Sequence, residues 1–191
     1  MLYQYKRHQP QSTPLLNSDQ GKYLLDSARD AWSLLSGVLA IIHPKQYEMG
    51  CQIHRSMLSR HRCSEPIARW PSVQTALSII SNRETPFHRD DKSRMQWYDL
   101  LTSIGTYSRA PLYLSPLNVR FDNTPGSVCA FSGMAIRHGV RKCTGARISI
   151  ASYLRDDVRE GERVIAADWM TQKEYLPYIG HKGIRIKHLR R

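Results

Sequence analysis

The chain has 191 residues, of which 41% are hydrophobic and 23% are charged. This composition is typical of a globular domain that is long enough to bury its own core, and it excludes wholesale disorder. Lys and Arg outnumber Asp and Glu by 28 to 16, and the formal charge of +12 favours a polyanionic partner such as nucleic acid, although a basic surface without a dedicated ligand is an equal alternative.

The cysteines and the apolar segments bear on where the protein works. Four cysteines, at positions 51, 63, 129 and 143, form no dense framework, so we expect free thiols in a reducing compartment. The basic start of the chain has no apolar run behind it, and the longest mostly apolar stretch, residues 31–42, is too short to span a bilayer. We therefore expect a nuclear or cytoplasmic protein without a membrane partner, and the sequence indicates no obligate protein partner.

Helices are predicted in the first third of the chain. Residues 1–18 are rich in Gln, Ser and Pro, and we expect them to form a flexible arm. Apolar residues then recur at helical spacing from Asp19 to Ile42, with Asp19 available as the N-cap, and again over residues 46–60. Both helices lie within residues 19–70, a segment that we expect to support a sheet.

Short strands are expected after Pro71, because the apolar segments become short, β-branched or aromatic and are separated by turn residues. They are predicted at residues 75–81, 85–89, 97–107, 112–114, 119–121, 127–132, 135–138 and 147–154. Helices followed by eight strands favour an α+β fold with a jelly-roll core over residues 71–160. Residues 19–191 would then form one domain that ends in a basic segment, residues 161–191.

Three separated residues form a candidate iron site. His88 and Asp90 are two positions apart, so on an extended strand their side chains project from the same face. His138 follows in another predicted strand. Two imidazoles and one carboxylate on one face of an octahedral Fe(II) leave positions open for O₂ and a cosubstrate. We therefore predict that these three residues hold a catalytic iron.

A second group of residues fits the cosubstrate that such an oxygenase requires. Arg147 follows His138 on the next predicted strand, and Ser149 shares its face two positions later. A guanidinium fork with an adjacent hydroxyl suits the distal carboxylate of 2-oxoglutarate. Each motif is weak alone, but the order H-x-D, His and Arg-x-Ser within the strand-rich part of the chain favours the joint interpretation.

Two further patterns have competing interpretations. Cys51, His54, His61 and Cys63 have a spacing that could bind zinc, although a packed helix beside a basic surface accounts for this region better. The tail, residues 181–191, alternates basic and apolar residues. It suits either contact with a DNA backbone or a short edge strand protected by its charges.

Five segments between residues 70 and 159 carry a resemblance to a known family. They read Asn-Arg-Glu-Thr-Pro-Phe-His-Arg-Asp at 82–90, Trp-Tyr-Asp-Leu-Leu at 97–101, Pro-Gly-Ser-Val at 125–128, Arg-His-Gly-Val at 137–140 and Gly-Ala-Arg-Ile-Ser at 145–149. In these segments the chain resembles the Tet and J-binding-protein family of nucleic-acid-modifying dioxygenases, and most of all its short fungal members. It departs from larger relatives in lacking their Cys-rich zinc-binding regions.

The resemblance implies a double-stranded β-helix with Fe(II) at His88, Asp90 and His138 and with 2-oxoglutarate at Arg147 and Ser149. It also implies an enzyme that uses O₂ to oxidise the methyl group of a methylated base in DNA. The usual substrate of such enzymes is 5-methylcytosine, which becomes 5-hydroxymethylcytosine and further products in the chemistry of DNA demethylation.

Recognition of the base needs residues beyond the iron ligands. A base within a duplex cannot reach a buried iron, so the substrate must be flipped or supplied single-stranded. Asp91 is a candidate base reader because a carboxylate accepts from the exocyclic amine of cytosine or adenine, and Arg94 is a candidate for contact with phosphate or cosubstrate. A solvated surface role is the alternative for both residues.

Other functions fit the same residues. N6-methyladenine is the second candidate base, and RNA, a protein side chain or a small molecule could replace DNA as the substrate. The alternative from another class is a nucleic-acid-binding module that keeps the fold without catalysis.

Overall fold

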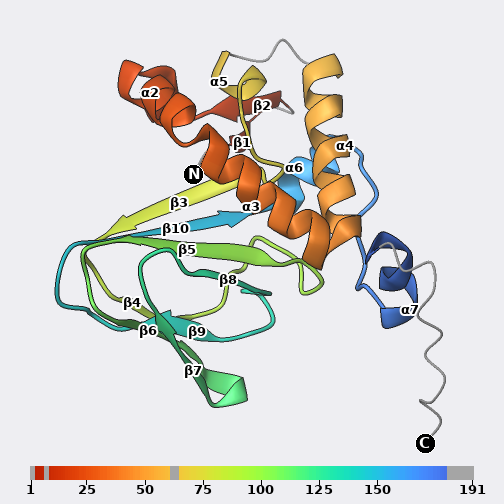
Figure 1. The fold of residues 1–191 in the computed structure, drawn as a ribbon. Coiled ribbons are helices and arrows are strands. Elements are labelled where there is room, and N and C mark those ends of the chain that lie inside the picture. Colours follow the sequence, from red (N-terminus) through yellow and green to blue (C-terminus); the bar gives the residue numbers. More distant parts are fainter. Residues whose placement is uncertain (1–2, 7–8, 61–64, 180–191) are drawn as a thin grey trace, which may run out of the picture.

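Two four-stranded antiparallel sheets face each other below a layer of helices in the computed structural model, which describes residues 3–6, 9–60 and 65–179 (Figure 1). The major sheet has the strand order β3-β10-β5-β8, and the minor sheet has the order β4-β9-β6-β7. The strands are β3 (Ala76–Ser81), β4 (Thr85–His88), β5 (Asp99–Gly105), β6 (Ala110–Leu114), β7 (Val119–Asn123), β8 (Val128–Phe131), β9 (His138–Val140) and β10 (Arg147–Tyr153). Because the chain repeatedly crosses between the sheets, this part is a jelly roll.

Helices precede the sheets and also follow them. They are α1 (Pro14–Asn17), α2 (Asp19–Ser27), α3 (Arg29–Ile42), α4 (Pro44–Arg60), α5 (Glu65–Ala68), α6 (Asp156–Gly161) and α7 (Gln172–Tyr175), with 3₁₀ turns η1 (Ser115–Leu117) and η2 (Leu176–Ile179). Within the described residues, every helix is too short or too polar to cross a bilayer. The basic tail, residues 181–191, lies outside the described residues.

The predicted α+β class is confirmed, and each of the eight expected strands is present with shifted ends. The single helix expected from Asp19 to Ile42 is wrong, because the backbone leaves helical geometry at Ala28 (φ −101°, ψ 6°). Apolar spacing continues across this break, so periodicity alone does not reveal it. The cap of α2 also differs: the hydroxyl of Ser18, rather than the side chain of Asp19, accepts the Gly21 N–H.

The start of the chain contains regular structure where we expected a flexible arm. β1 (Tyr3–Lys6) pairs with β2 (Gln9–Ser12) as an antiparallel hairpin, and α1 follows directly. Leu16 of α1 is buried in the helical core. The flexible arm was predicted from composition alone. The helical turn at residues 14–17 is too short to give an apolar periodicity that would have indicated a helix.

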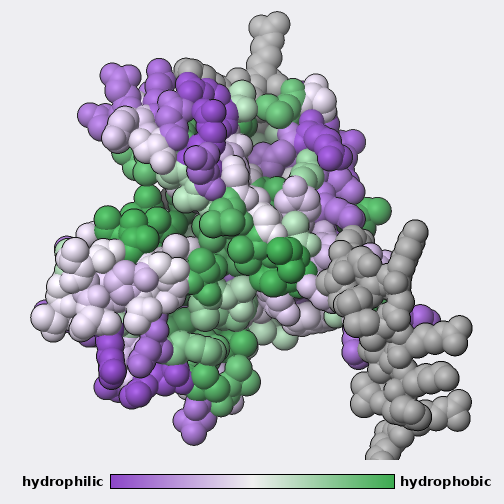
Figure 2. Space-filling model, viewed as in Figure 1, coloured by the Kyte–Doolittle hydropathy of each residue, from purple (hydrophilic) through white to green (hydrophobic). Residues whose placement is uncertain are grey.

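The larger apolar core lies between the helices and the outer face of the major sheet. Leu39 of α3, Ile53 of α4 and Leu100 of β5 are fully buried there. Burial of each such side chain contributes roughly 1.5–3 kcal/mol. The helices cover only part of the sheet, since hydrophobic residues lie at the surface over α3 and over the uncovered end of the strands (Figure 2). Ile104 of β5 and Ile148 of β10 are exposed.

A smaller apolar cluster lies between the two sheets. It includes Leu112 and Leu114 of β6, Phe131 of β8 and Val140 of β9. The inner face of the major sheet is by contrast partly polar, since Ser103 and Arg147 are buried there. The space between the sheets therefore combines an apolar wall with a polar one, as expected of a binding cavity.

One buried glutamine fixes α4 to the segment that leads into β5. The Gln46 side chain donates to the Tyr98 carbonyl oxygen at 2.8 Å and accepts from the Tyr98 N–H at 2.8 Å. His43 adds a second connection, because its Nε2 lies 3.0 Å from the carbonyl oxygen of Gln96. The helix thus holds the backbone on which Asp99 begins β5.

Replacement of Gln46 by Ala should destabilise the fold, because it leaves the partly buried Tyr98 N–H without its partner and the Tyr98 carbonyl oxygen with only the longer bond from Gln74 Nε2, at 3.4 Å. We expect the free energy of unfolding to fall by about 2–4 kcal/mol, measured by urea denaturation. The matched control is Gln52→Ala at an exposed position of the same helix, for which the change should be small. Equal stability of the two variants would contradict this role.

Candidate metal centre

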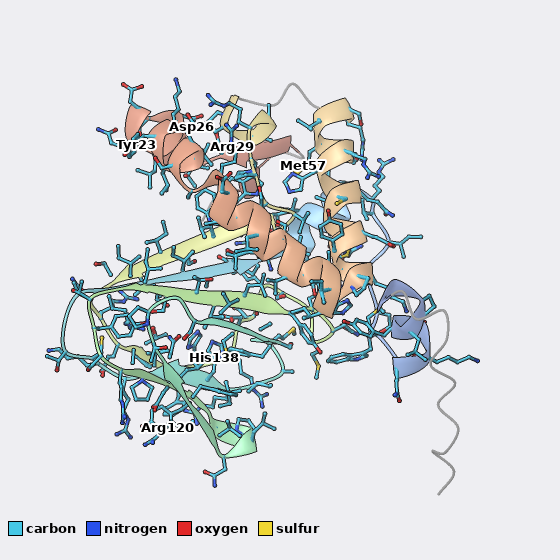
Figure 3. All side chains as sticks on the ribbon, viewed as in Figure 1. Tyr23, Asp26, Arg29, Met57, Arg120 and His138 are labelled. Carbon is cyan, nitrogen blue, oxygen red and sulfur yellow. The ribbon has the colours of Figure 1, made fainter. Side chains whose placement is uncertain are left out.

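Two strands of the minor sheet bring the three predicted iron ligands together. β4 ends at His88 and β9 begins at His138, and these residues are opposite each other in the antiparallel pairing. Their imidazole rings are 4.4 Å apart between centroids. In Figure 3 His138 lies in the space between the two sheets. The fold therefore joins two histidines that are far apart in the sequence.

Asp90 completes the group. Its Oδ1 lies 3.5 Å from Nε2 of His88, and its Oδ2 lies 3.8 Å from Nε2 of His138. One ligand atom from each residue lies within 4.8 Å of the other two, and no other such group of three or more His, Cys, Asp or Glu occurs among the described residues. These spacings leave room for one shared ion with two nitrogen ligands and one oxygen ligand.

Backbone carbonyl groups orient both imidazoles. Nδ1 of His88 lies 2.8 Å from the Pro86 carbonyl oxygen, and Nδ1 of His138 lies 3.0 Å from the Ile136 carbonyl oxygen. A carbonyl oxygen can only accept, so each Nδ1 carries the proton and each Nε2 keeps its lone pair. Burial lowers the pKa of His138, which further favours the neutral ring that metal binding requires. The donor set therefore fits Fe(II).

Gly133 sets the position of Asp90. The Asp90 N–H donates to the Gly133 carbonyl oxygen at 3.0 Å, and the Gly133 N–H donates to Oδ2 of Asp99 at 3.0 Å. A methyl group on Gly133 would overlap with the carboxylates of both aspartates. The absence of a side chain at this position therefore allows the two carboxylates to lie close together.

Asp99 is a buried carboxyl group beside the candidate metal ligands. Burial is the main cause that raises its pKa to about 8, and the negative charge of Asp90 adds to this effect, while the hydrogen bond from the Gly133 N–H opposes it. Only 2% of Asp99 is exposed. In the absence of a cation, the protonated form is therefore favoured near neutral pH.

A cavity of about 200 Å³ opens beside the three candidate ligands. Its walls come from both sheets and from the segment between β4 and β5. The lining residues are Ser78, Ile80, Thr85, His88, Asp90, Asp91, Lys92, Ser93, Asp99, Leu101, His138, Val140, Ser149, Ala151, Tyr153 and Arg155. The predicted site residues His88, Asp90, His138, Asp91 and Ser149 therefore share one cavity.

Arg147 lies on the inner face of β10 but does not line that cavity. It is 1% exposed, and its Nη2 donates to the Arg83 carbonyl oxygen at 2.6 Å. Its Nε and Nη1 are buried and have no hydrogen-bond partner among the residues that the structure describes. A buried guanidinium with unused donors needs an anion, so its chemistry fits the carboxylate of a dicarboxylic acid.

Arg94 does not line the cavity that contains the three candidate iron ligands. It lines a neighbouring depression together with Asp91, and its Nε lies 2.8 Å from Oδ1 of Asp156 at the start of α6. Nε of Arg159 lies 2.6 Å from the same carboxylate oxygen. The side chain of Arg94 thus connects the segment after Asp90 to α6.

The cavity residues that the sequence interpretation missed include Asp99, Tyr153 and Arg155. Asp99 lies in a quoted motif, but nothing in the sequence distinguishes a buried carboxyl from an exposed one. Tyr153 and Arg155 continue the alternation that begins at Arg147 and Ser149. Extending that alternation to the end of the strand would have identified Tyr153 from the sequence.

Of the four residues in the possible zinc site, His61 and Cys63 lie outside the described residues. Cys51 and His54 both lie on α4. Burial lowers the pKa of His54 to about 4. Cys51, Cys129 and Cys143 are free thiols, as expected.

Comparisons with known proteins agree with this geometry. The Tet/JBP family model, which represents an oxygenase domain of the 2OGFeDO superfamily, matches residues 1–156. Among solved structures, NgTET1 in complex with 5mC DNA is similar with a TM-score of 0.61 and 18% sequence identity. The match covers 89% of this chain and 63% of the NgTET1 chain, so this chain spans less than two thirds of that protein. No curated protein matches the chain.

A methyl group at position 133 should weaken the metal centre. In Gly133→Ala, Asp90 and Asp99 must move away from the new Cβ, and we expect metal affinity to fall on the order of 10- to 100-fold. Titration with Mn(II), a redox-stable substitute for Fe(II), measures this affinity. The control is Gly37→Ala, at a helical position where a Cβ meets no atom within 4 Å, and it should bind metal as the unaltered chain does.

The buried carboxyl of Asp99 should make the metal-free protein sensitive to pH. Its pKa is about 8 in the fold and 3.8 in a model peptide, so its contribution to stability is complete below pH ~4 and is lost as the pH rises toward ~8. Asp99→Asn should remove this loss. Urea denaturation with chelator between pH ~5 and ~8 compares the two proteins, and identical pH slopes would contradict the assignment.

Proposed function

This chain belongs to the Tet/JBP family of 2-oxoglutarate- and Fe(II)-dependent oxygenases, and on that basis we propose that it oxidises the methyl group of a methylated base in DNA. The first candidate substrate is 5-methylcytosine, which would become 5-hydroxymethylcytosine and further products. The observation that carries the proposal is the convergence of His88, Asp90 and His138 at one cavity. A DNA substrate would imply a nuclear place of action.

The iron would be held by Nε2 of His88, Nε2 of His138 and the carboxylate of Asp90. Iron with 2-oxoglutarate and O₂ supplies the oxidising power needed to break a C–H bond of the substrate. The protein contributes the fixed orientation of the ligands, because the carbonyl groups of Pro86 and Ile136 hold each imidazole by its other nitrogen.

We propose that Arg147 and Ser149 bind the cosubstrate. Arg147 offers two unused donors in a buried site, and Ser149 lines the cavity two positions further along the same strand. The guanidinium would bind the distal carboxylate of 2-oxoglutarate, and the hydroxyl of Ser149 would donate to the same group. The keto acid end of 2-oxoglutarate would then extend into the cavity toward the three candidate iron ligands.

We propose that Asp91 reads the base. It lines both the cavity and the adjacent depression, and its carboxylate would accept from the exocyclic amine of a flipped base. Arg94 lines only the depression, where it forms ion pairs with Asp156 and Glu160. With its remaining donors it would contact a phosphate next to that base. Cytosine and adenine both carry such an amine, so N6-methyladenine is the second candidate substrate.

Two independent features support nucleic acid over other substrates. The formal charge is +12, and the similar protein NgTET1 has been observed with 5mC DNA. A protein side chain or a small molecule would leave the positive charge without a use, whereas RNA would use it as DNA does.

Mass spectrometry of digested DNA tests the proposed function. After incubation with Fe(II), 2-oxoglutarate and a duplex that carries 5-methylcytosine, we expect 5-hydroxymethylcytosine together with equivalent succinate. His88→Ala and Asp90→Ala should abolish both products at unchanged melting temperature. Succinate without an oxidised base would reject methylcytosine in favour of another substrate, and the absence of succinate with every substrate would indicate a binding module.

Substitution of Arg147 separates cosubstrate binding from metal binding. Loss of charge-assisted hydrogen bonds costs ~1.5–3 kcal/mol, so Arg147→Ala should raise the KM for 2-oxoglutarate by roughly 10- to 150-fold. Arg147→Lys keeps the charge without the planar fork and should have an intermediate KM. Mn(II) affinity should remain unchanged in both variants, and an unaltered KM in Arg147→Ala would contradict the assignment.

A further inference from the structure

Arginine and aromatic side chains gather on the outer face of the minor sheet, away from the cavity. This arginine–aromatic face consists of Phe87, Tyr113, Arg120, Arg137 and Arg141. In Figure 3 Arg120 lies on the side of the minor sheet that is turned away from the major sheet, whereas His138 lies between the sheets.

Strand register places these residues on one side. Tyr113 of β6 is opposite Arg120 of β7 and opposite Gly139 of β9. Their neighbours Leu112 and Leu114 belong to the apolar cluster between the sheets. Because side chains alternate along a strand, the minor sheet carries the iron ligands on one face and the arginine–aromatic face on the other.

Gly139 allows the two aromatic rings to meet across β9. The rings of Phe87 and Tyr113 lie 6.2 Å apart between centroids at an angle of 64°. A Cβ on Gly139 would come within 3.2–3.3 Å of the Phe87 backbone. Because Gly139 has no side chain, the rings of Phe87 and Tyr113 can form an edge-to-face contact above it.

Two arginines are stacked on these rings. The guanidinium carbon of Arg137 lies 5.5 Å from the centroid of Phe87, and that of Arg141 lies 5.1 Å from the centroid of Tyr113. Stacking restricts the rotation of a long side chain but leaves its N–H edge available. These guanidinium groups are thus held in place before any ligand binds.

No carboxylate neutralises the three arginines. Across the part of the chain that the structure describes, the side chains of Arg120, Arg137 and Arg141 form no ion pair or hydrogen bond, and all three residues are exposed. The acid on this face, Asp122, lies 3.9 Å from Nε of Arg109 instead. Three unpaired cations beside the exposed ring of Phe87 and the half-buried ring of Tyr113 are complementary to a phosphodiester backbone.

We propose that the arginine–aromatic face is a second DNA-binding surface, which contacts phosphates independently of base sequence and methylation. It lies across the minor sheet from the cavity, so it binds a part of the DNA other than the flipped base. Its use would be to retain the enzyme on long DNA between encounters with modified bases. The proposal does not depend on which base is oxidised, or on turnover.

The test compares two triple variants in binding to unmethylated 40-base-pair DNA, without Fe(II) or 2-oxoglutarate. One variant is Arg120→Gln, Arg137→Gln and Arg141→Gln. The matched control, Arg55→Gln, Arg163→Gln and Lys173→Gln, removes the same charge from exposed residues elsewhere. Fluorescence anisotropy at several salt concentrations gives the Kd and its salt dependence, and thermal melting verifies that both variants are folded.

Loss of three phosphate contacts should reduce the slope of log Kd against log salt by about 2.7, since each contact contributes about 0.9. At low salt we expect the Kd of the first variant to rise at least ~10-fold, while the control stays within ~3-fold of the unaltered chain. Equal losses in both variants would attribute binding to net charge and overturn the proposal. Unchanged DNA binding in the first variant would also overturn it, and would point to an acidic protein partner.

A second variant tests the contribution of the rings without a change in charge. Phe87→Leu removes the aromatic surface beneath Arg137 and should weaken binding by a smaller factor, about 2- to 5-fold, as expected for an exposed cation–π contact of ~0.5–1 kcal/mol. An unaltered Kd would show that stacking on Phe87 does not prepare Arg137 for phosphate and would overturn that part of the proposal.

Discussion

His88 and His138 lie opposite each other because β4 and β9 pair as antiparallel neighbours, and the candidate metal centre depends on this pairing. A shift of the register by one residue would turn one imidazole to the other face of the sheet. Asp90 is fixed in turn by its backbone hydrogen bond to Gly133. The three candidate ligands are therefore positioned by strand pairing and by backbone hydrogen bonds.

Polar groups are buried without partners between the two sheets, which indicates that this space binds a ligand. Asp99 and Arg147 are both buried, and each leaves polar atoms without a partner. Desolvation of such groups destabilises a fold unless a ligand or an ion compensates for it. A cation at the carboxylates and an anion at the guanidinium would satisfy both groups, and Fe(II) with 2-oxoglutarate, the pair used by this family, supplies one of each.

The two faces of the minor sheet carry different kinds of side chain. His138 points toward the cavity, and its neighbour Arg137 is stacked on Phe87 outside. The alternation of side chains along β-strands makes this arrangement possible without additional structure. Any force that DNA exerts on the outer face would act on the strands that carry the candidate iron ligands.

The sequence alone indicated the α+β class, the approximate positions of all eight strands and His88, Asp90 and His138 as candidate iron ligands. Hydrophobic alternation and the H-x-D spacing are local properties, and the third candidate ligand followed from the order of the motifs along the chain. The sequence did not determine the break at Ala28, the hairpin at the start of the chain, the burial of Asp99 or the outward cluster around Tyr113. Those features were decided by tertiary structure, since a strand's partners, its register and the burial of its side chains depend on contacts between segments that are distant in the chain.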